Sequence, residues 1–172
     1  MSIKLVVAHD NERGIGRAGQ LPWRLPGEMA KLSAATRRTA DPSKRNALVM
    51  GRLTYESFPA SRRPLAGRLN VVVTSRPIPD AEVQTAATLE AAVAEAVGAA
   101  DVEDVFIFGG ARIYKEALDD LIPDELLVSV VDGVFQCDTF LSHLPASYIL
   151  EKSTEETYEG TRVVHERYRL RR

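Results

Sequence analysis

Val105-Phe-Ile-Phe-Gly-Gly-Ala-Arg-Ile-Tyr114 joins a short apolar run to a pair of glycines and the start of a helical pattern. The uninterrupted apolar run predicts a strand that is covered on both faces, as in a parallel sheet. The helical pattern continues from Ala111 to Leu121 and ends before Pro123. Backbone N–H groups at such a strand-to-helix junction suit a phosphate or a close-lying cofactor. Paired glycines there also serve tight packing, so both interpretations stay open at this point.

The same alternation of strands and helices extends through the rest of the chain. Apolar runs predict strands at residues 3–8, 47–50, 71–74 and 126–131, and helical spacing predicts helices at residues 27–38, 54–58 and 89–97. Gly98 is expected to cap the last of these helices. Residues 148–170 alternate around Glu159-Gly160, which predicts a long antiparallel hairpin. The pattern indicates an α/β fold with a mostly parallel central sheet and an antiparallel C-terminal hairpin.

Length and composition indicate one globular domain, residues 1–172. Hydrophobic residues make up 45% of the chain and charged residues 27%, and the formal net charge is -2, which argues against a general nucleic-acid or anionic-membrane binder. Cys137 has no partner for a disulfide, and His9, His143 and His165 show no metal-ligand spacing. The N-terminus does not resemble a signal peptide, and no apolar run reaches membrane-spanning length. We therefore expect a cytoplasmic protein that holds no metal.

Glu28 stands out as the only acidic residue between Arg13 and Arg38. The preceding segment, Leu21-Pro-Trp-Arg-Leu-Pro-Gly27, leads into a helix, so the carboxylate falls in the first helical turn. Such an apolar approach is expected to half bury the carboxylate, which then needs a hydrogen-bond donor. The alternative is a solvated first-turn glutamate that pairs with Lys31 at i+3.

Gly14-Ile-Gly-Arg-Ala-Gly19 formally matches the dinucleotide-binding pattern G-x-G-x-x-G. That motif should open a helix directly, whereas Pro22, Trp23 and Pro26 intervene here. We interpret the segment as a mobile loop whose glycines permit unusual backbone angles and which carries Leu21 and Trp23 as a lid. A plain connecting loop is the alternative.

Polar and basic side chains follow three of the predicted strands. These segments are Gly51-Arg-Leu-Thr54, Thr74-Ser-Arg76 and Gly109-Gly110. The carboxyl ends of parallel strands meet at one edge of a sheet, where ligands bind. Three such ends together predict a ligand that carries a polyphosphate. Arg68, between a glycine and a buried strand, is placed to bind a carboxylate bidentately.

Taken in order, these segments resemble those of dihydrofolate reductases. The shared motifs extend across essentially the whole chain: Gly14-Ile-Gly16, Leu21-Pro-Trp23, Leu25-Pro26, Glu28, residues 49–57, residues 63–70, residues 108–114 and Asp138-Thr139. The resemblance implies an eight-stranded α/β fold flanked by about four helices, with NADPH as the hydride donor and 7,8-dihydrofolate as the substrate. Hydride transfer to C6 and protonation of N5 would give 5,6,7,8-tetrahydrofolate for one-carbon metabolism and thymidylate synthesis. Antifolate inhibitors are the further ligands that the family implies, and we expect a monomer.

On the substrate side, the resemblance makes Glu28 the acid that pairs with the ring N–H and the 2-amino group of the pterin. Ser129, expected at the start of a strand, would hydrogen-bond this carboxylate, and Trp23 would hold a water beside it. The proton would reach N5 through water near the Leu21 loop, and Arg68 would bind the α-carboxylate of the substrate. The remaining residues implied for substrate binding are Val6, Val7, Ala8, Leu32, Phe58, Leu65, Phe108 and Tyr114.

On the cofactor side, the resemblance implies a phosphate-binding set, a ribose-binding pair and residues that flank the nicotinamide. The phosphates would contact Arg52, Leu53, Thr54, Ser75, Arg76 and Arg112. The nicotinamide ribose would contact Ile15 and Gly16, and the nicotinamide would lie beside Gly109, Gly110 and Tyr114. Ala8, Gly51, Thr74, Phe108, Ala111 and Ile113 complete the set. The Gly109–Gly110 and Arg63–Pro64 peptides are expected to be cis, as in many relatives.

Three positions depart from the usual pattern of the family. Leu32 stands where an aromatic ring is usual, Tyr55 where Trp is usual, and Ser129 where Thr is usual; these changes concern affinity and inhibitor profile, not the reaction. Two other functions are alternatives. Glu28 argues against a reductase of the same fold that acts on another heterocycle, such as a riboflavin-pathway pyrimidine. The intact cofactor-side residues argue against a non-catalytic folate- or nucleotide-binding protein.

Overall fold

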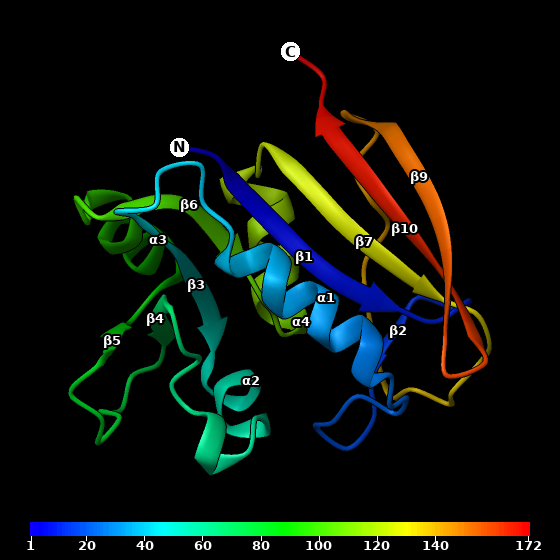
Figure 1. The fold of residues 1–172 in the computed structure, drawn as a ribbon, viewed down its shortest axis with the longest axis horizontal. Helices are drawn as coiled ribbons and strands as arrows, with labels where there is room; N and C mark the ends of the chain where they lie inside the picture. Colours follow the sequence, from blue (N-terminus) through cyan, green and yellow to red (C-terminus); the bar gives the residue numbers. More distant parts are fainter.

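The apolar run around Phe106 forms β6, near the middle of an eight-stranded sheet in the computed structural model, which describes residues 1–172 (Figure 1). The strand order is β5-β4-β3-β6-β1-β7-β10-β9. The first six strands in this order run parallel to one another. Their bounds are β5 (Val83–Ala86), β4 (Arg68–Val73), β3 (Arg45–Gly51), β6 (Val102–Ile107), β1 (Ile3–His9) and β7 (Glu125–Val131).

The predicted C-terminal hairpin is confirmed. It consists of β9 (Tyr148–Tyr158) and β10 (Thr161–Leu170), and β10 adds to the sheet antiparallel to β7. The turn places Glu159 at φ 47° and Gly160 at φ 81°, the left-handed values that a tight hairpin turn requires. The sheet is therefore mostly parallel, with an antiparallel edge, as the sequence pattern predicts.

Neighbouring residues of each central strand pack on opposite faces of the sheet. In β1, Leu5 and Val7 belong to a cluster of 23 buried residues, whereas Val6 belongs to a second cluster of seven. In β3, Val49 faces the first cluster and Leu48 the second. Because both faces are covered, these strands read as continuous apolar runs instead of alternating ones.

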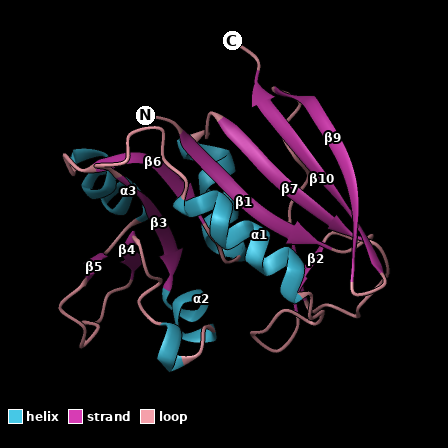
Figure 2. Cartoon of the chain, in the orientation of Figure 1, coloured by secondary structure: helices cyan, strands magenta, loops and turns pink.

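Four α-helices cover the two faces (Figures 1 and 2). The larger cluster includes side chains of α3 (Leu89–Gly98) and α4 (Ala111–Glu116), and a π-helical turn (Ala117–Leu121) extends α4. The smaller cluster includes Tyr55 of α2 (Arg52–Ser57), and Leu32 of α1 (Pro26–Arg37) packs against it. The predicted helices thus form with bounds that shift by one or two residues, and the helix predicted for residues 111–121 changes to a π-helix in its last turn.

Four short elements are absent from the sequence-based expectation. They are β5, the 3-10 turn Ala60–Arg62, and the two-stranded sheet of β2 (Gly14–Gly16) and β8 (Thr139–Phe140). These segments are too short or too polar to show a period, and tertiary pairing creates them. Gly98 is the last residue of α3 and Ala99 is its C-cap, so the expected glycine cap is wrong. None of the helices has the length and apolar character needed to cross a membrane.

Candidate active site

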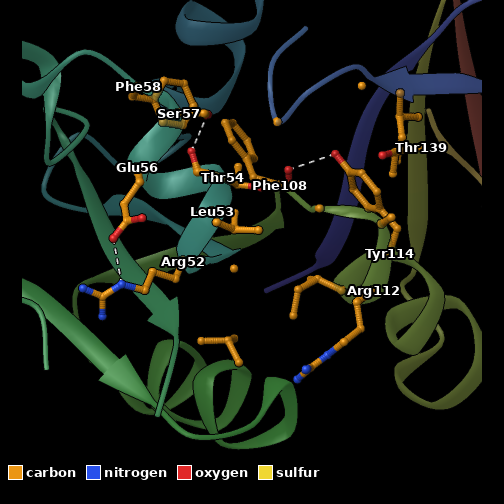
Figure 3. Close-up of a pocket in the computed structure, with 18 of the residues that line it drawn as sticks. Arg52, Leu53, Thr54, Glu56, Ser57, Phe58, Phe108, Arg112, Tyr114 and Thr139 are labelled. Carbon is orange, nitrogen blue, oxygen red and sulfur yellow. Dashed lines mark hydrogen bonds and ion pairs between the residues drawn. The ribbon is translucent and has the colours of Figure 1, made fainter. Parts of the chain in front are cut away.

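The carboxyl ends of β1, β3, β4 and β6 border one cavity of ≈ 920 Å³ (Figure 3). A parallel sheet gathers its carboxyl ends along one edge, so residues far apart in sequence meet there. The lining residues named in the sequence analysis are Val6, Val7, Ala8, Ile15, Gly16, Leu21, Glu28, Leu32, Gly51, Arg52, Leu53, Thr54, Phe58, Thr74, Ser75, Arg76, Phe108, Gly110, Ala111, Arg112, Ile113 and Tyr114. The expectation that three strand ends contribute to one site agrees with this arrangement.

Glu28 supplies a buried carboxylate at one side of the cavity. Pro26 occupies the first turn of α1, where its missing N–H costs nothing, and Glu28 follows in the same turn. The residue is 5% exposed. Burial raises the pKa of Glu28, and the Ser129 hydroxyl and the Lys31 ammonium offset part of this rise. The Lys31 ammonium itself is ion-paired with Glu156, so the solvated Glu28–Lys31 pair is not what forms.

Ser129 is the fifth of the seven residues of β7, not at the start of a strand as expected. Its hydroxyl is near enough to Glu28 to lower the pKa of that carboxyl. The Ser129 Oγ atom lies 3.0 Å from Nδ1 of His165 on β10, and the two atoms form a hydrogen bond. The Ser129 hydroxyl therefore has a hydrogen-bond partner, His165, that the sequence does not identify as part of the site.

Basic and hydroxyl groups gather at the end of the cavity formed by α2 and the segment after β4. Arg52, Arg76 and Arg112 all line it, together with Thr54 and Ser75. Figure 3 shows Arg52 and Arg112 reaching this region from α2 and α4, on either side of Leu53. The arrangement adds cationic and hydroxyl donors to the cavity that Glu28 also lines, and such donors suit a phosphate-bearing ligand.

Arg52 is held in place by several contacts. Its Nε donates to Oε1 of Glu56 at 2.7 Å (Figure 3), and its Nη1 lies 3.3 Å from Oγ1 of Thr74. The same Nη1 also contacts the carbonyl oxygens of Arg76 at 3.2 Å and of Pro77 at 3.4 Å. Arg52 thus ties α2 to the segment that follows β4, in addition to offering its charge to the cavity.

The Gly109–Gly110 and Arg63–Pro64 peptides are both cis, as expected. Gly109 has φ 100°, and a Cβ at this position would lie 2.6 Å from the ring of Tyr114. The hydroxyl of Tyr114 contacts the carbonyl oxygen of Val6 at 2.7 Å. It also contacts the carbonyl oxygen of Phe108 at 2.9 Å (Figure 3). Burial raises the pKa of Tyr114. This tyrosine therefore joins the middle of β1 to the residue that follows β6 and leaves room only for glycine at 109.

Five of the expected site residues do not line the cavity: Trp23, Leu65, Arg68, Gly109 and Ser129. Trp23 is 7% exposed and packs edge-on against Phe135, with ring centroids 5.4 Å apart. Arg68 donates from Nη1 to Thr36 Oγ1 at 2.9 Å. Burial, and then the charge of Arg37, lower the pKa of Arg68 to about 10, so the guanidinium stays charged at neutral pH.

Several lining residues were not identified from the sequence: Gly19, Gln20, Met29, Glu56, Ser57, Val73, Ala87 and Thr139. Met29 directly follows Glu28, and Thr139 is part of the Asp138-Thr139 motif, so a sequence motif marked both positions. No such motif includes Ala87. Asp10, 1% exposed, was also missed: its carboxylate accepts from the N–H groups of Glu12, Gly14 and Phe135 and so shapes the loop before Leu21.

Comparison with known proteins identifies the family. The family model described as dihydrofolate reductase matches residues 2–171. A dihydrofolate reductase of Drosophila melanogaster is 38% identical over 152 residues, 86% of this chain and 83% of that protein. A putative dihydrofolate reductase of Caenorhabditis elegans is 37% identical over 171 residues, 95% of this chain and 90% of that protein.

Similarity extends to longer proteins. A bifunctional dihydrofolate reductase-thymidylate synthase of Daucus carota is 42% identical over 151 residues, which cover 84% of this chain. The match spans 29% of that protein, and a corresponding match to the Glycine max protein spans 27%. The chain thus covers less than a third of the length of these bifunctional relatives. The match over residues 2–171 and the identity to full-length relatives show that the chain belongs to the dihydrofolate reductase family.

Proposed function

We propose that the protein reduces 7,8-dihydrofolate to 5,6,7,8-tetrahydrofolate with NADPH, by hydride transfer to C6 and protonation of N5. The product would serve one-carbon metabolism and thymidylate synthesis. The observation that carries the proposal is the placement of Glu28, a buried carboxylate on the wall of a cavity that Arg52, Arg76 and Arg112 also line. Family membership makes this placement specific for a pterin.

The side of the cavity near Glu28 suits the pterin ring. A carboxylate only accepts hydrogen bonds, so it can pair with a ring N–H and an adjacent amino group. Leu32 of α1 and Phe58 after α2 add apolar surface to the same cavity. A ring anchored on Glu28 would extend past these side chains, with its acceptor atoms in a largely dry space. Dry surroundings strengthen the pairing with the carboxylate.

The other end of the cavity fits NADPH. Arg52, Ser75 and Arg76 offer cationic and hydroxyl donors for a 2′-phosphate, and Thr54 and Arg112 for the diphosphate. Because residues 109 and 110 carry no side chains, a flat ring can approach the backbone closely there. When bound there, NADPH supplies the hydride.

The side chains of this protein would bind and orient the two ligands and would assist the protonation of N5. Tyr114 joins β1 to the segment after β6 at the cavity wall through Val6 and Phe108, which fixes the surface on which the two rings would lie. The raised pKa of Glu28 brings its protonation closer to neutral pH. Leu21, 45% exposed at the cavity mouth, is placed to limit the entry of water.

Arg68 is proposed to bind the α-carboxylate of the substrate, outside the main cavity. Its Nε and Nη1 are used by the Ala66 carbonyl and by Thr36, which hold the guanidinium in one orientation. The charge persists at neutral pH, as the site requires. Antifolate inhibitors are proposed to occupy the substrate side of the same cavity. A monomeric state and a cytoplasmic location complete the proposal.

A direct assay tests the function. Purified protein is mixed with NADPH and dihydrofolate, and the loss of NADPH absorbance is followed. We expect a loss that requires both the protein and dihydrofolate. A protein that is folded and binds NADPH, yet oxidises it only with a riboflavin-pathway pyrimidine, would instead support the related reductase. Binding of both ligands without oxidation would support a non-catalytic binding protein.

A further inference from the structure

Asp10 is a buried carboxylate whose hydrogen-bond partners are three backbone N–H groups and one thiol. It directly follows β1 and is 1% exposed. Its Oδ1 accepts from the N–H groups of Gly14 at 2.8 Å and of Glu12 at 2.9 Å. Its Oδ2 accepts from the N–H of Phe135 at 3.0 Å and lies 3.6 Å from Sγ of Cys137. The carboxylate thus joins the segment after β1 to a segment 125 positions further along the chain.

The two sides of this arrangement require a charged carboxylate. Burial raises the pKa of Asp10, but the N–H groups of Phe135, Gly14 and Glu12 lower it by more, so the group is ionised at neutral pH. A carboxylate accepts at both oxygens, whereas the amide of asparagine accepts at one end and donates at the other. Only the carboxylate can therefore satisfy the N–H groups on both sides.

The first of the two segments leads into the Leu21 loop, which we define as residues 17–22. Gly14 begins β2, and Ile15 and Gly16 of this strand line the cavity. The backbone N–H of Asp10 also donates to the Gly14 carbonyl oxygen at 2.9 Å, so both the backbone and the side chain of Asp10 hold Gly14. Figure 1 shows β2 just beyond the carboxyl end of β1. The start of the Leu21 loop is thus fixed against Asp10.

The second segment reaches the other end of the same loop. Phe135, whose N–H is bound by Asp10, packs its ring edge-on against Trp23, with ring centroids 5.4 Å apart. Trp23 directly follows the Leu21 loop and is 7% exposed. Leu21, two residues earlier, is 45% exposed and lines the cavity. One carboxylate therefore holds both ends of the loop, the first directly and the second through Phe135.

We propose that Asp10 is a positioning residue for the cofactor side of the cavity, because its carboxylate holds the two ends of the Leu21 loop in a single arrangement. In that arrangement Ile15 and Gly16 lie on the cavity wall, where the proposed function places the nicotinamide ribose. Without the carboxylate the loop would populate other arrangements, and NADPH would bind only to the fraction of molecules with the loop in place. The identity of the ligand rests on the proposed function, whereas the arrangement of the loop belongs to the protein without ligand.

A role of Asp10 in general stability alone makes a different prediction. None of the hydrogen bonds of the Asp10 side chain reaches α1, which carries Glu28 and Leu32. A change confined to the Leu21 loop should therefore weaken the binding of NADPH and spare the substrate side of the cavity. A fold that is loosened throughout would weaken the binding of both ligands.

The test compares the natural protein with two substitutions of Asp10. Asp10→Asn keeps the shape of the side chain but turns an NH2 group toward one of the N–H donors. Asp10→Ser keeps an acceptor for the nearby N–H groups of residues 12 and 14, but its side chain is too short to reach Phe135. Trp23 is the only tryptophan, so acrylamide quenching of its fluorescence in ligand-free protein reports on the end of the loop. Separate titrations with NADPH and with an antifolate measure the two sides of the cavity.

Two control variants separate the loop from its surroundings and from stability. Cys137→Ala removes the thiol beside Oδ2 and leaves the three N–H contacts of Asp10 in place. Asp124→Asn changes another carboxylate that accepts from a backbone N–H, that of Ile3 at 2.9 Å, at the opposite end of β1. Both controls should leave Trp23 quenching unchanged and NADPH affinity within about twofold of the natural protein. A circular dichroism melt sets a temperature at which every variant is folded.

We expect both Asp10 variants to increase the quenching of Trp23 and to weaken NADPH binding roughly fivefold or more, with antifolate affinity changed by less than about twofold. Asp10→Ser provides the result if Asp10→Asn does not fold. Unchanged quenching, unchanged NADPH affinity, or equal weakening of both ligands would overturn the proposal. A natural protein that binds NADPH but does not oxidise it with dihydrofolate would refute the proposed function and leave the quenching result unaffected.

Discussion

Glu28 and Leu32 lie one helical turn apart on α1, and both line the same cavity. Glu28 is buried, while Leu32 is half-buried against the cluster that contains Val6 and Phe106. A ligand anchored on the carboxylate must therefore pass over the Leu32 side chain. The sequence has leucine here, where the family usually carries an aromatic ring.

Leu32→Phe should tighten the binding of dihydrofolate or an antifolate by a few-fold to about tenfold. An aromatic ring can stack against the benzoyl group of the ligand, which contributes roughly 0.5–1.5 kcal/mol beyond the buried area. Equilibrium titration of ligand fluorescence measures the change. Val97→Phe, on the exposed side of α3, is the matched control that adds a ring elsewhere. Unchanged ligand affinity, or a change in NADPH affinity instead, would count against this placement of the substrate.

Removal of the basic groups beside α2 should weaken the preference for NADPH over NADH. A charge-assisted hydrogen bond contributes about 1.5–3 kcal/mol, so Arg52→Ala with Arg76→Ala should narrow the preference at least tenfold, a factor that corresponds to about 1.4 kcal/mol. Steady-state kinetics with both cofactors measure it. Arg76→Ala alone tests the effect of removing a charge. Arg52→Ala would in addition break the contact between the Arg52 and Thr74 side chains. Arg62→Ala, outside the cavity, is the control. A double variant that still discriminates fully would place the 2′-phosphate elsewhere.

Glu28→Gln should make the protein more stable at neutral pH. Because burial raises the pKa of Glu28 above its usual value of 4.5, the folded protein binds this proton more tightly than the unfolded chain. The resulting stability is present below pH 4.5 and is lost as the pH rises through the folded pKa. Each pKa unit corresponds to about 1.4 kcal/mol. One kcal/mol moves the Tm of a domain of this size by about 2–4 °C.

Thermal unfolding at pH 7 and at about pH 4 measures the effect of Glu28→Gln, and the gain in Tm should shrink at the lower pH. Glu95→Gln, which changes an exposed carboxylate of α3, is the matched control and should leave the Tm nearly unchanged. If the Tm of Glu28→Gln at pH 7 were equal to or lower than that of the natural protein, burial of the charged carboxylate would not destabilise the fold.

Gly109→Ala should lower stability and NADPH affinity together. The added Cβ would lie 2.6 Å from the Tyr114 ring, at a backbone φ of 100° that alanine rarely adopts. Displacing Tyr114 would also disturb its contacts with Val6 and Phe108. Gly98→Ala is the control: nothing lies within 4 Å of its Cβ, and in a helix alanine should stabilise by up to about 1 kcal/mol. Similar melting temperatures for the two variants would contradict this account of Gly109.

The repeating part of the fold could be predicted because it depends on local patterns. The apolar runs of β1, β3, β4 and β6 and the alternating hairpin around Gly160 are visible in the sequence, since burial on both faces or on one face dictates residue type. The position of the cavity at the carboxyl ends of these strands could also be predicted, because parallel strands bring those ends together along one edge of the sheet. β2 and β8 could not be predicted, because each is short and exists only through pairing with the other.

The site could be predicted where a motif marked it and not where tertiary packing created it. Glu28 was recognisable from its isolation in the sequence. Trp23 was expected at the site, but it packs into a cluster with Leu25 and Phe135 that no local pattern reveals. The contact between Ser129 and His165 joins residues 36 positions apart through the register of β7 and β10. Such a contact becomes visible only when the strands are paired.

The pH dependence of NADPH oxidation by the natural protein and by Glu28→Gln tests the central claim most directly. The glutamine side chain would occupy the same space but would lack the charge that balances a protonated pterin. We expect Glu28→Gln to stay folded and to bind NADPH, with turnover of dihydrofolate lower by orders of magnitude at neutral pH and partly restored at low pH, where the substrate protonates without help. Near-natural turnover of Glu28→Gln at neutral pH would contradict the assignment of Glu28 as the acid that binds and activates the substrate.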